Sequence, residues 1–178
     1  MAQTEHSTGN NVQSQATIKV SKNKKHYKYF SETAPVTMAD GSTKAIADVR
    51  VGESVKTCKD GKATVTQVKQ IDVYNKPGSS LTAIYLRPAG HETLTAQKVP
   101  ALLLEATPHH RVQTRRGKKR MNRLSKNDVL YHYEPATGIV SAWKVGAIQQ
   151  NARQVSRAYN LTTEEGTYLV DNVMVANN

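Results

Sequence analysis

A threonine and two histidines lie close together in one segment of this 178-residue chain. The run LLLEATPHHRVQT, residues 102–114, holds Thr107, Pro108, His109 and His110. Proline disfavours a helical backbone in the residue before it, so we expect Thr107 to be extended and the histidines to lie on a turn at a strand end. A histidine can donate a proton to the nitrogen that leaves a broken amide, and a threonine hydroxyl is a second donor. These side chains are candidates for assisting amide cleavage, and histidines on a surface turn are the alternative.

A second candidate for chemistry is the pair of asparagines, Asn177 and Asn178, that ends the chain. The side-chain amide of an asparagine can attack its own backbone carbonyl and release the next residue, leaving a succinimide, if the protein holds the geometry. Asn177 therefore has the chemistry for a cleavage at its own carbonyl. The alternative is that both asparagines are frayed terminal residues.

Short strand-like segments separated by turn signals fill most of the chain after residue 29. They are PVTM (35–38), ESVKTCK (53–59), TVTQVKQIDVY (64–74), LTAIYL (81–86), VLYHY (129–133), IVSAWKVGAI (139–148), AYNLTT (158–163) and TYLVDNVMVA (167–176). Asp40-Gly41 and Asp60-Gly61 predict hairpins with type I′ turns. Only RMNRLSKNDVL, residues 120–130, favours a short helix. The sequence therefore predicts an all-β fold of many short strands, a sandwich or a partly closed, curled sheet.

The first 28 residues differ in composition from the rest. Residues 1–17 are mainly Gln, Asn, Ser, Thr and Gly, and residues 19–28 hold five lysines and no acid. Such segments bury too little apolar surface to offset the entropy of ordering. We expect residues 1–28 to be a disordered polar and basic lead-in, with an edge strand beginning near Ile18 as an alternative, and residues 29–178 to form one domain.

The net charge of +11 makes anionic partners a hypothesis to weigh. Eight basic residues and no acid lie between residues 111 and 126: Arg111, Arg115, Arg116, Lys118, Lys119, Arg120, Arg123 and Lys126. Such a patch can neutralise phosphates while Tyr131, Tyr133 and Trp143 stack on unpaired bases. A nucleic-acid-binding module is therefore one alternative function. A charged hairpin tip is the plainer interpretation.

Cysteine content and hydropathy exclude several classes of protein. The single cysteine, Cys58, excludes an intramolecular disulfide, a four-cysteine zinc site and a paired redox motif. No apolar run approaches the roughly 20 residues that cross a bilayer, and no secretory signal is visible at the N-terminus. The compartment stays open, and the chain is compatible with the C-terminal part of a larger secreted precursor.

The stretch YFSETAPVTMADGSTKAIADVRVGESVKT, residues 29–57, joins the candidate residues into one pattern. It resembles the opening of Hint domains, the hedgehog/intein family, and more closely their bacterial intein-like type. The matching residues are Val36, Met38, Asp40, Gly41, Ile46, Asp48, Val49 and Val51 to Val55. TPHHRVQT resembles the family's Thr-x-x-His block, which places Thr107 and His110 on its activating residues. Residues 159–177 resemble its closing blocks, so the resemblance spans most of the chain.

The resemblance implies a fold and a self-processing activity. Hint domains form a curled, partly closed β-sheet horseshoe. Their first residue, Cys or Ser, attacks the preceding carbonyl, the Thr and His distort and protonate that amide, and in inteins a final Asn cyclises. The implied substrate is the chain's own flanking polypeptide in cis, and the implied reaction needs no cofactor. We expect the chain to be a monomer with no metal site and no membrane contact. Asn177 and Asn160 fall on the closing blocks, where Asn160 replaces an aspartate that assists in some members.

This chain departs from the family pattern where the nucleophile is expected. The first cysteine of the family falls on Tyr29, whose phenol oxygen sits at the far end of a rigid ring and cannot reach the preceding carbonyl. Ser31 is a weak substitute, because the start would shift by two residues. Ala176 stands where the penultimate histidine is expected. We therefore expect a degenerate Hint domain, impaired in N-terminal cleavage and with residual C-terminal cleavage. A Hint fold kept only as a structural module is a further alternative.

Overall fold

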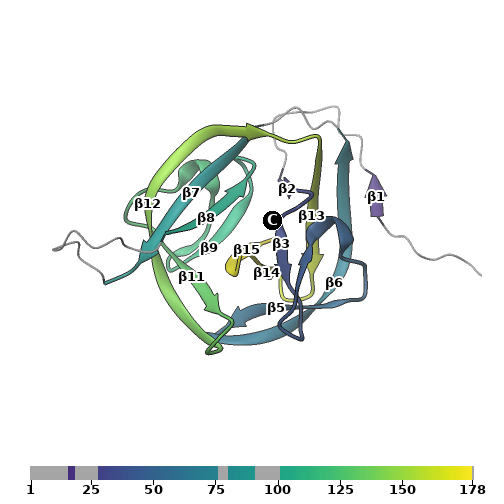
Figure 1. Cartoon of the computed structure of the whole chain (residues 1–178), viewed down its shortest axis with the longest axis horizontal. Helices are drawn as coiled ribbons and strands as arrows, with labels where there is room; N and C mark the ends of the chain where they lie inside the picture. The colour runs from purple at the N-terminus through teal and green to yellow at the C-terminus, as the bar shows by residue number, and fades with distance from the viewer. Residues whose placement is uncertain (1–15, 19–27, 76–79, 91–100, 178) are drawn as a thin grey trace, which may run out of the picture.

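The computed structural model describes residues 16–18, 28–75, 80–90 and 101–177, and it confirms the predicted all-β fold (Figure 1). Fifteen strands are present in these ranges. The first eight are β1 (Ala16–Ile18), β2 (Phe30–Ser31), β3 (Pro35–Thr37), β4 (Thr43–Ala45), β5 (Ser54–Lys59), β6 (Lys62–Asn75), β7 (Ser80–Pro88) and β8 (Leu102–Ala106). The others are β9 (Arg111–Thr114), β10 (Gly117–Arg120), β11 (Val129–Glu134), β12 (Ile139–Gln154), β13 (Arg157–Thr163), β14 (Thr167–Val170) and β15 (Val173–Ala176).

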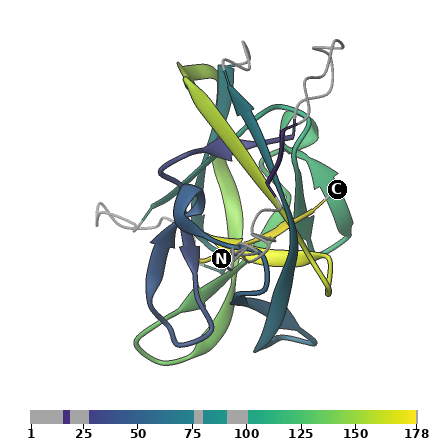
Figure 2. The same ribbon diagram turned by 90° about the vertical axis from the view of Figure 1, so that its right-hand side faces the viewer.

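The strands form two curled sheets. One has the order β1-β6-β13-β2, with β5 also paired to β6. The other has the order β4-β3-β14-β15-β9-β11-β12-β7-β8, with β10 paired to β9. Figure 1 shows the long strands β6, β7 and β12 curving around the periphery while β14 and β15 lie in the middle, and Figure 2 shows the same arrangement from the side. The result is the partly closed, horseshoe-like sheet that the resemblance implied.

One apolar core holds the two sheets together, and the central strands contribute most fully to it. All four residues of β14 are buried, as are most residues of β13 and β15. In the long strand β12, by contrast, Val145 is the one buried residue. The strands that carry the chain's C-terminal segment are therefore the best packed part of the molecule.

The two Asp-Gly signals give different turns. Asp60 and Gly61 both have positive φ, at 52° and 74°, so the β5–β6 hairpin has the predicted I′ pattern. At the β3–β4 turn Gly41 alone has positive φ, and its N–H donates to the Met38 carbonyl across a four-residue turn. This second turn is therefore not of type I′, because Asp40 does not enter the left-handed region.

One sequence expectation about local structure is corrected. Residues 120–130 form no α-helix: the described helical content there is one three-residue 3-10 turn, η3 (Met121–Arg123), which resembles η2 (Ile46–Asp48). Within the lead-in, Ala16–Ile18 form β1 and pair in parallel with residues 71–73 of β6, because the edge of that long strand offers free ladder groups. The rest of residues 1–27 lies outside the described residues. No helix in the described ranges is long and apolar enough to cross a membrane.

Candidate functional site

The Thr107 hydroxyl contacts the peptide amide at which the resemblance places the scissile bond. The backbone N–H of Tyr29 donates to Thr107 Oγ1 at 2.8 Å, and the N–H of Thr107 donates to the Tyr29 carbonyl at 3.0 Å. Both residues are buried. This pair of hydrogen bonds joins the segment before β2 to the end of β8. It places a hydroxyl oxygen on the nitrogen of the bond between Lys28 and Tyr29.

The Tyr29 side chain lies in an apolar setting. Its ring packs on Tyr74 with centroids 3.9 Å apart, and it forms a small buried cluster with Ala158. A residue's own side chain attacks the preceding carbonyl through a five-membered ring only when the nucleophilic atom is on Cβ, and the phenol oxygen of Tyr29 is not. The position is therefore filled by a packing residue.

Ser31, the weak substitute nucleophile, lies in β2 with its backbone paired to Ala158 of β13. Its hydroxyl is 3.2 Å from Thr33 Oγ1 and accepts a hydrogen bond from the Thr33 N–H at 3.4 Å. The Thr107 contacts centre on the Tyr29 amide, two residues before Ser31. Thr107 therefore contacts the Tyr29 amide, where the resemblance places the first residue of the domain.

His110 is completely buried on the turn between β8 and β9. Its ring packs against Phe30, with centroids 4.2 Å apart. Nδ1 lies 3.0 Å from the Arg111 carbonyl oxygen, and Nε2 lies 3.2 Å from Asn160 Oδ1. The imidazole is thus directed toward β13, whereas Thr107 is directed toward Tyr29. The two members of the Thr-x-x-His block face different partners.

Asn160 connects His110 to the C-terminal asparagine. Its Oδ1 accepts from Tyr168 Oη at 2.8 Å, and its Nδ2 donates to the Asn177 backbone carbonyl at 3.1 Å. Because Tyr168 Oη accepts from the Leu161 N–H, its proton points to Asn160, which fixes the amide orientation. Both ring nitrogens of His110 thus face acceptor oxygens, Asn160 Oδ1 and the Arg111 carbonyl, and a neutral ring can donate to only one of them.

Burial favours the neutral form of the His110 ring. Removal from water is the main influence on its pKa, which is lowered to about 4. The hydrogen bonds to Asn160 and to the Arg111 carbonyl raise the pKa, and the positive charge of Lys28 lowers it. The ring is therefore neutral at pH 7. A neutral, buried imidazole is poorly placed to supply a proton to a leaving nitrogen.

The Asn177 side chain is held by the backbone of Thr163. Its Oδ1 accepts from the Thr163 N–H and its Nδ2 donates to the Thr163 carbonyl, each at 3.2 Å. Its own N–H donates to the Gly166 carbonyl at 2.9 Å. Nδ2 is the atom that would attack the Asn177 carbonyl, so these contacts retain the nucleophile on Thr163. The Asn160 amide, in contrast, already contacts the oxygen on which negative charge would develop.

The structure brings Thr107, His110, Asn160 and Asn177 into one buried centre together with the backbone of Tyr29. Sequence reasoning missed Tyr168 and Thr163, which orient Asn160 and Asn177 respectively. The separation of eight residues between Asn160 and Tyr168 carries no local signal, since the contact depends on the pairing of separate strands. In the described ranges, no group of three or more His, Cys, Asp or Glu residues could hold a metal ion.

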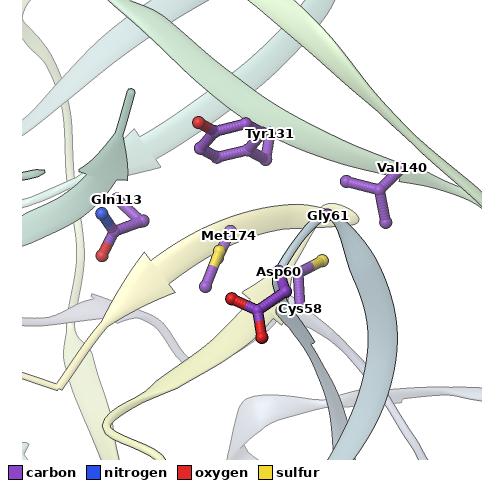
Figure 3. A pocket seen from close by; sticks show the side chains of 7 residues that line it. All are labelled: Cys58, Asp60, Gly61, Gln113, Tyr131, Val140 and Met174. Carbon is purple, nitrogen blue, oxygen red and sulfur yellow. The ribbon is translucent and has the colours of Figure 1, made fainter. Parts of the chain in front are cut away.

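Cys58 lies away from this centre, in a separate cluster with Tyr133 and Leu169. It lines a hollow of about 300 Å³ with Asp60, Gly61, Gln113, Tyr131, Val140 and Met174 (Figure 3). Burial raises the pKa of its thiol to about 11, so the thiol is protonated at neutral pH. Cys58 therefore packs as a neutral thiol in its own cluster, apart from the Tyr29–Thr107 contact.

The fold of this chain is similar to those of several inteins. It has a TM-score of 0.67 with a mutant of the Ssp DnaB mini-intein variant M86, at 14% identity over 86% of this chain and 93% of that one. With a DnaB intein from Synechocystis sp. PCC 6803 the TM-score is 0.64 and the identity 17%, over 84% of this chain and 98% of that one. With a bacterial intein-like domain from Clostridium thermocellum the TM-score is 0.55 and the identity 17%, over 85% of this chain and 99% of that one.

The chain therefore has the intein-like Hint fold over most of its length. No family model matches the sequence, and no curated protein matches it either. At identities of 12 to 17% the solved structures establish the architecture. The chemistry of this chain has to be argued from its own residues.

Proposed function

We propose that this chain, with residues 29–178 as its processing domain, is an intein-like self-processing domain that has lost N-terminal cleavage. The observation that carries the proposal is the 2.8 Å hydrogen bond from the Tyr29 N–H to Thr107 Oγ1. It supports the bond between Lys28 and Tyr29 as the ancestral scissile bond, still held by its activating threonine. The residue after that bond is a tyrosine, which has no atom able to form the five-membered ring.

The substrate in this proposal is the chain's own polypeptide, in cis. Residues preceding Tyr29 would be the acyl group of the N-terminal step, and residues following Asn177 the leaving group of the C-terminal step. Asn160 and Asn177 support slow C-terminal cleavage, because Asn160 Nδ2 already donates to the carbonyl oxygen that would become the oxyanion. Ala176, in place of a penultimate histidine, and the hold of Thr163 on Asn177 would slow it.

The N-terminal step is tested by intact mass measurement of the full chain and of its Tyr29→Cys variant. The wild-type chain should keep the bond between residues 28 and 29 with or without a thiol reagent. Tyr29→Cys places a nucleophile on Cβ, and thiol treatment should then release residues 1–28. Adding Thr107→Val to Tyr29→Cys removes the hydroxyl at similar volume and should suppress that release. Prompt release of residues 1–28 from the wild-type chain would overturn the proposal.

The C-terminal step needs its own substrate, a short peptide extension after Asn178. We expect slow loss of the residues after Asn177, abolished by Asn177→Ala and accelerated by Ala176→His. Asn178→Ala is the matched control, since it alters the neighbouring asparagine and leaves the proposed nucleophile in place. Equal cleavage in the Asn177→Ala variant would show that the asparagine is not the attacking residue.

A further inference from the structure

Two arginines of one hairpin lie close enough to Lys28, the residue before Tyr29, for their charges to act on it. Arg111 of β9 and Arg120 of β10 are direct cross-strand partners, so both project from the same face of this hairpin. The pKa of the Lys28 ammonium is lowered, mainly because the group is partly buried. The positive charges of Arg111 and Arg120 lower this pKa further. Like charges placed directly opposite one another destabilise a strand pair.

No acidic side chain in the described part of the chain compensates these three charges. The ion pairs found there are Lys44–Glu53, Lys59–Glu165, Lys69–Glu164, Lys119–Asp128 and Arg153–Glu105. Lys119, next to Arg120 in β10, is neutralised by its ion pair with Asp128. Lys28, Arg111 and Arg120 take part in none of these ion pairs. All three are half-buried, which reduces the screening that water gives to surface charges.

The backbone around the three residues is fixed. Met121 N–H donates to the His110 carbonyl at 2.9 Å, and Asn122 N–H donates to the Pro108 carbonyl at 2.9 Å, so the end of β10 is tied to the turn before β9. The paired hydrogen bonds between Tyr29 and Thr107 hold the neighbour of Lys28. The positive groups therefore meet on a preorganised support, which lowers the entropy lost when a ligand binds.

We propose that Lys28, Arg111 and Arg120 form a binding site for an oxyanion of the phosphate class. Two guanidinium groups offer forked donors that match phosphate oxygens, and the lysine ammonium adds a point charge. A bound dianion would also relieve the repulsion between the cross-strand arginines. Lys28 precedes the bond proposed as the ancestral scissile bond, so the three-residue site is complete only in the uncleaved chain, the form that the proposed function expects.

An anion bound at this site would alter the electrostatic environment of His110 in the buried centre. The Lys28 charge is one of the influences that lower the pKa of His110, so an anion beside Lys28 should raise that pKa toward its ordinary value. The shift is visible in the NMR titration of the His110 ring. It provides a local readout in addition to affinity.

The binding test is calorimetric titration of the full chain with pyrophosphate, with chloride holding the ionic strength constant. We expect saturable binding that weakens about tenfold in Arg111→Gln and in Arg120→Gln, because each change removes charge-assisted hydrogen bonds. Arg115→Gln is the matched control, since it removes one charge from the exposed tip of the same hairpin. It should change the affinity less than about twofold, because an exposed charge at the hairpin tip is screened by salt. Melting curves of each variant establish that the fold is intact.

Competition with a single-stranded oligothymidine distinguishes the source of the phosphate. Displacement of pyrophosphate by the oligonucleotide, again lost in Arg120→Gln, would assign the site to a nucleic-acid backbone. Tight pyrophosphate binding without such competition would assign it to a free phosphate compound. The proposal is overturned if pyrophosphate does not bind, or if Arg115→Gln weakens binding as much as Arg120→Gln, which would indicate a diffuse basic surface.

Discussion

Asn160 is the residue on which the buried centre depends most. One amide group satisfies His110, Tyr168 and the Asn177 carbonyl, so three otherwise unrelated parts of the chain share a partner. An aspartate at this position would accept hydrogen bonds but could not donate to Asn177. The asparagine therefore changes what the position does relative to the family pattern: it becomes a donor to the C-terminal carbonyl.

Replacing Asn160 by alanine should destabilise the protein strongly. The change leaves Tyr168 Oη, His110 Nε2 and the Asn177 carbonyl without this partner in a buried site, so we expect a loss of about 2–4 kcal/mol in the free energy of unfolding. Tyr168→Phe removes only one hydroxyl of the same network and should cost about 1 kcal/mol. Urea unfolding of both variants measures these values. Equal small losses would show that the network contributes little.

The protonation of His110 should make stability depend on pH. The folded-state pKa is about 4, below the ordinary value of 6.5, so the unfolded chain binds more protons between these values and stability falls as the pH falls through this window. The largest loss from this group is about 3 kcal/mol. His110→Gln should lack this component. The measurement is the unfolding free energy of both proteins across this pH window, and parallel curves would contradict the assignment.

The candidate site was predictable from sequence only in part, and strand pairing explains the division. Thr107 and His110 follow from a local pattern and the family resemblance. Tyr168 and Thr163 become visible only when β13 and β14 are placed, because their partners are fixed by three-dimensional packing. The turn between β14 and β15 was missed for a different reason. Asp171 and Asn172, with φ of 52° and 60°, form a left-handed pair without the glycine that usually marks such a turn.

The β14–β15 turn also carries a destabilising charge. Burial raises the pKa of the Asp171 carboxyl to about 6, with Glu105 raising it further, so the folded protein binds this proton more tightly and loses stability as the pH rises from the ordinary value of 3.8 to about 6. Asp171→Asn keeps the preference for positive φ and removes the charge. We expect a gain of about 1–2 kcal/mol at neutral pH and little change in acid, where the carboxyl is protonated. Equal effects at both pH values would indicate a packing effect instead.

At the scale of the whole molecule, the segment at Tyr29 and the segment at Asn177 are both held in the buried interior. The segment entering β2 is tied to the end of β8 by Thr107, and the segment leaving β15 is tied to β13 by Asn160 and Thr163. In the view of Figure 1, β14 and β15 lie inside the outline of the peripheral strands. A fold that holds both segments in one buried centre is suited to chemistry on its own flanking peptides.

This arrangement predicts an uneven distribution of local stability. Residues of β14 are all buried and pair on both sides, with β3 and β15, whereas β12 has one buried residue among its 16. Hydrogen exchange of the intact chain should therefore be slowest in peptides from β13, β14 and β15, and at least about tenfold faster in the exposed half of β12 after Val145. Exchange in β14 that matches β12 would mean that the central strands open as readily as the periphery. In that case the buried centre could not hold Asn177 on Thr163 in the way proposed for its slow cleavage.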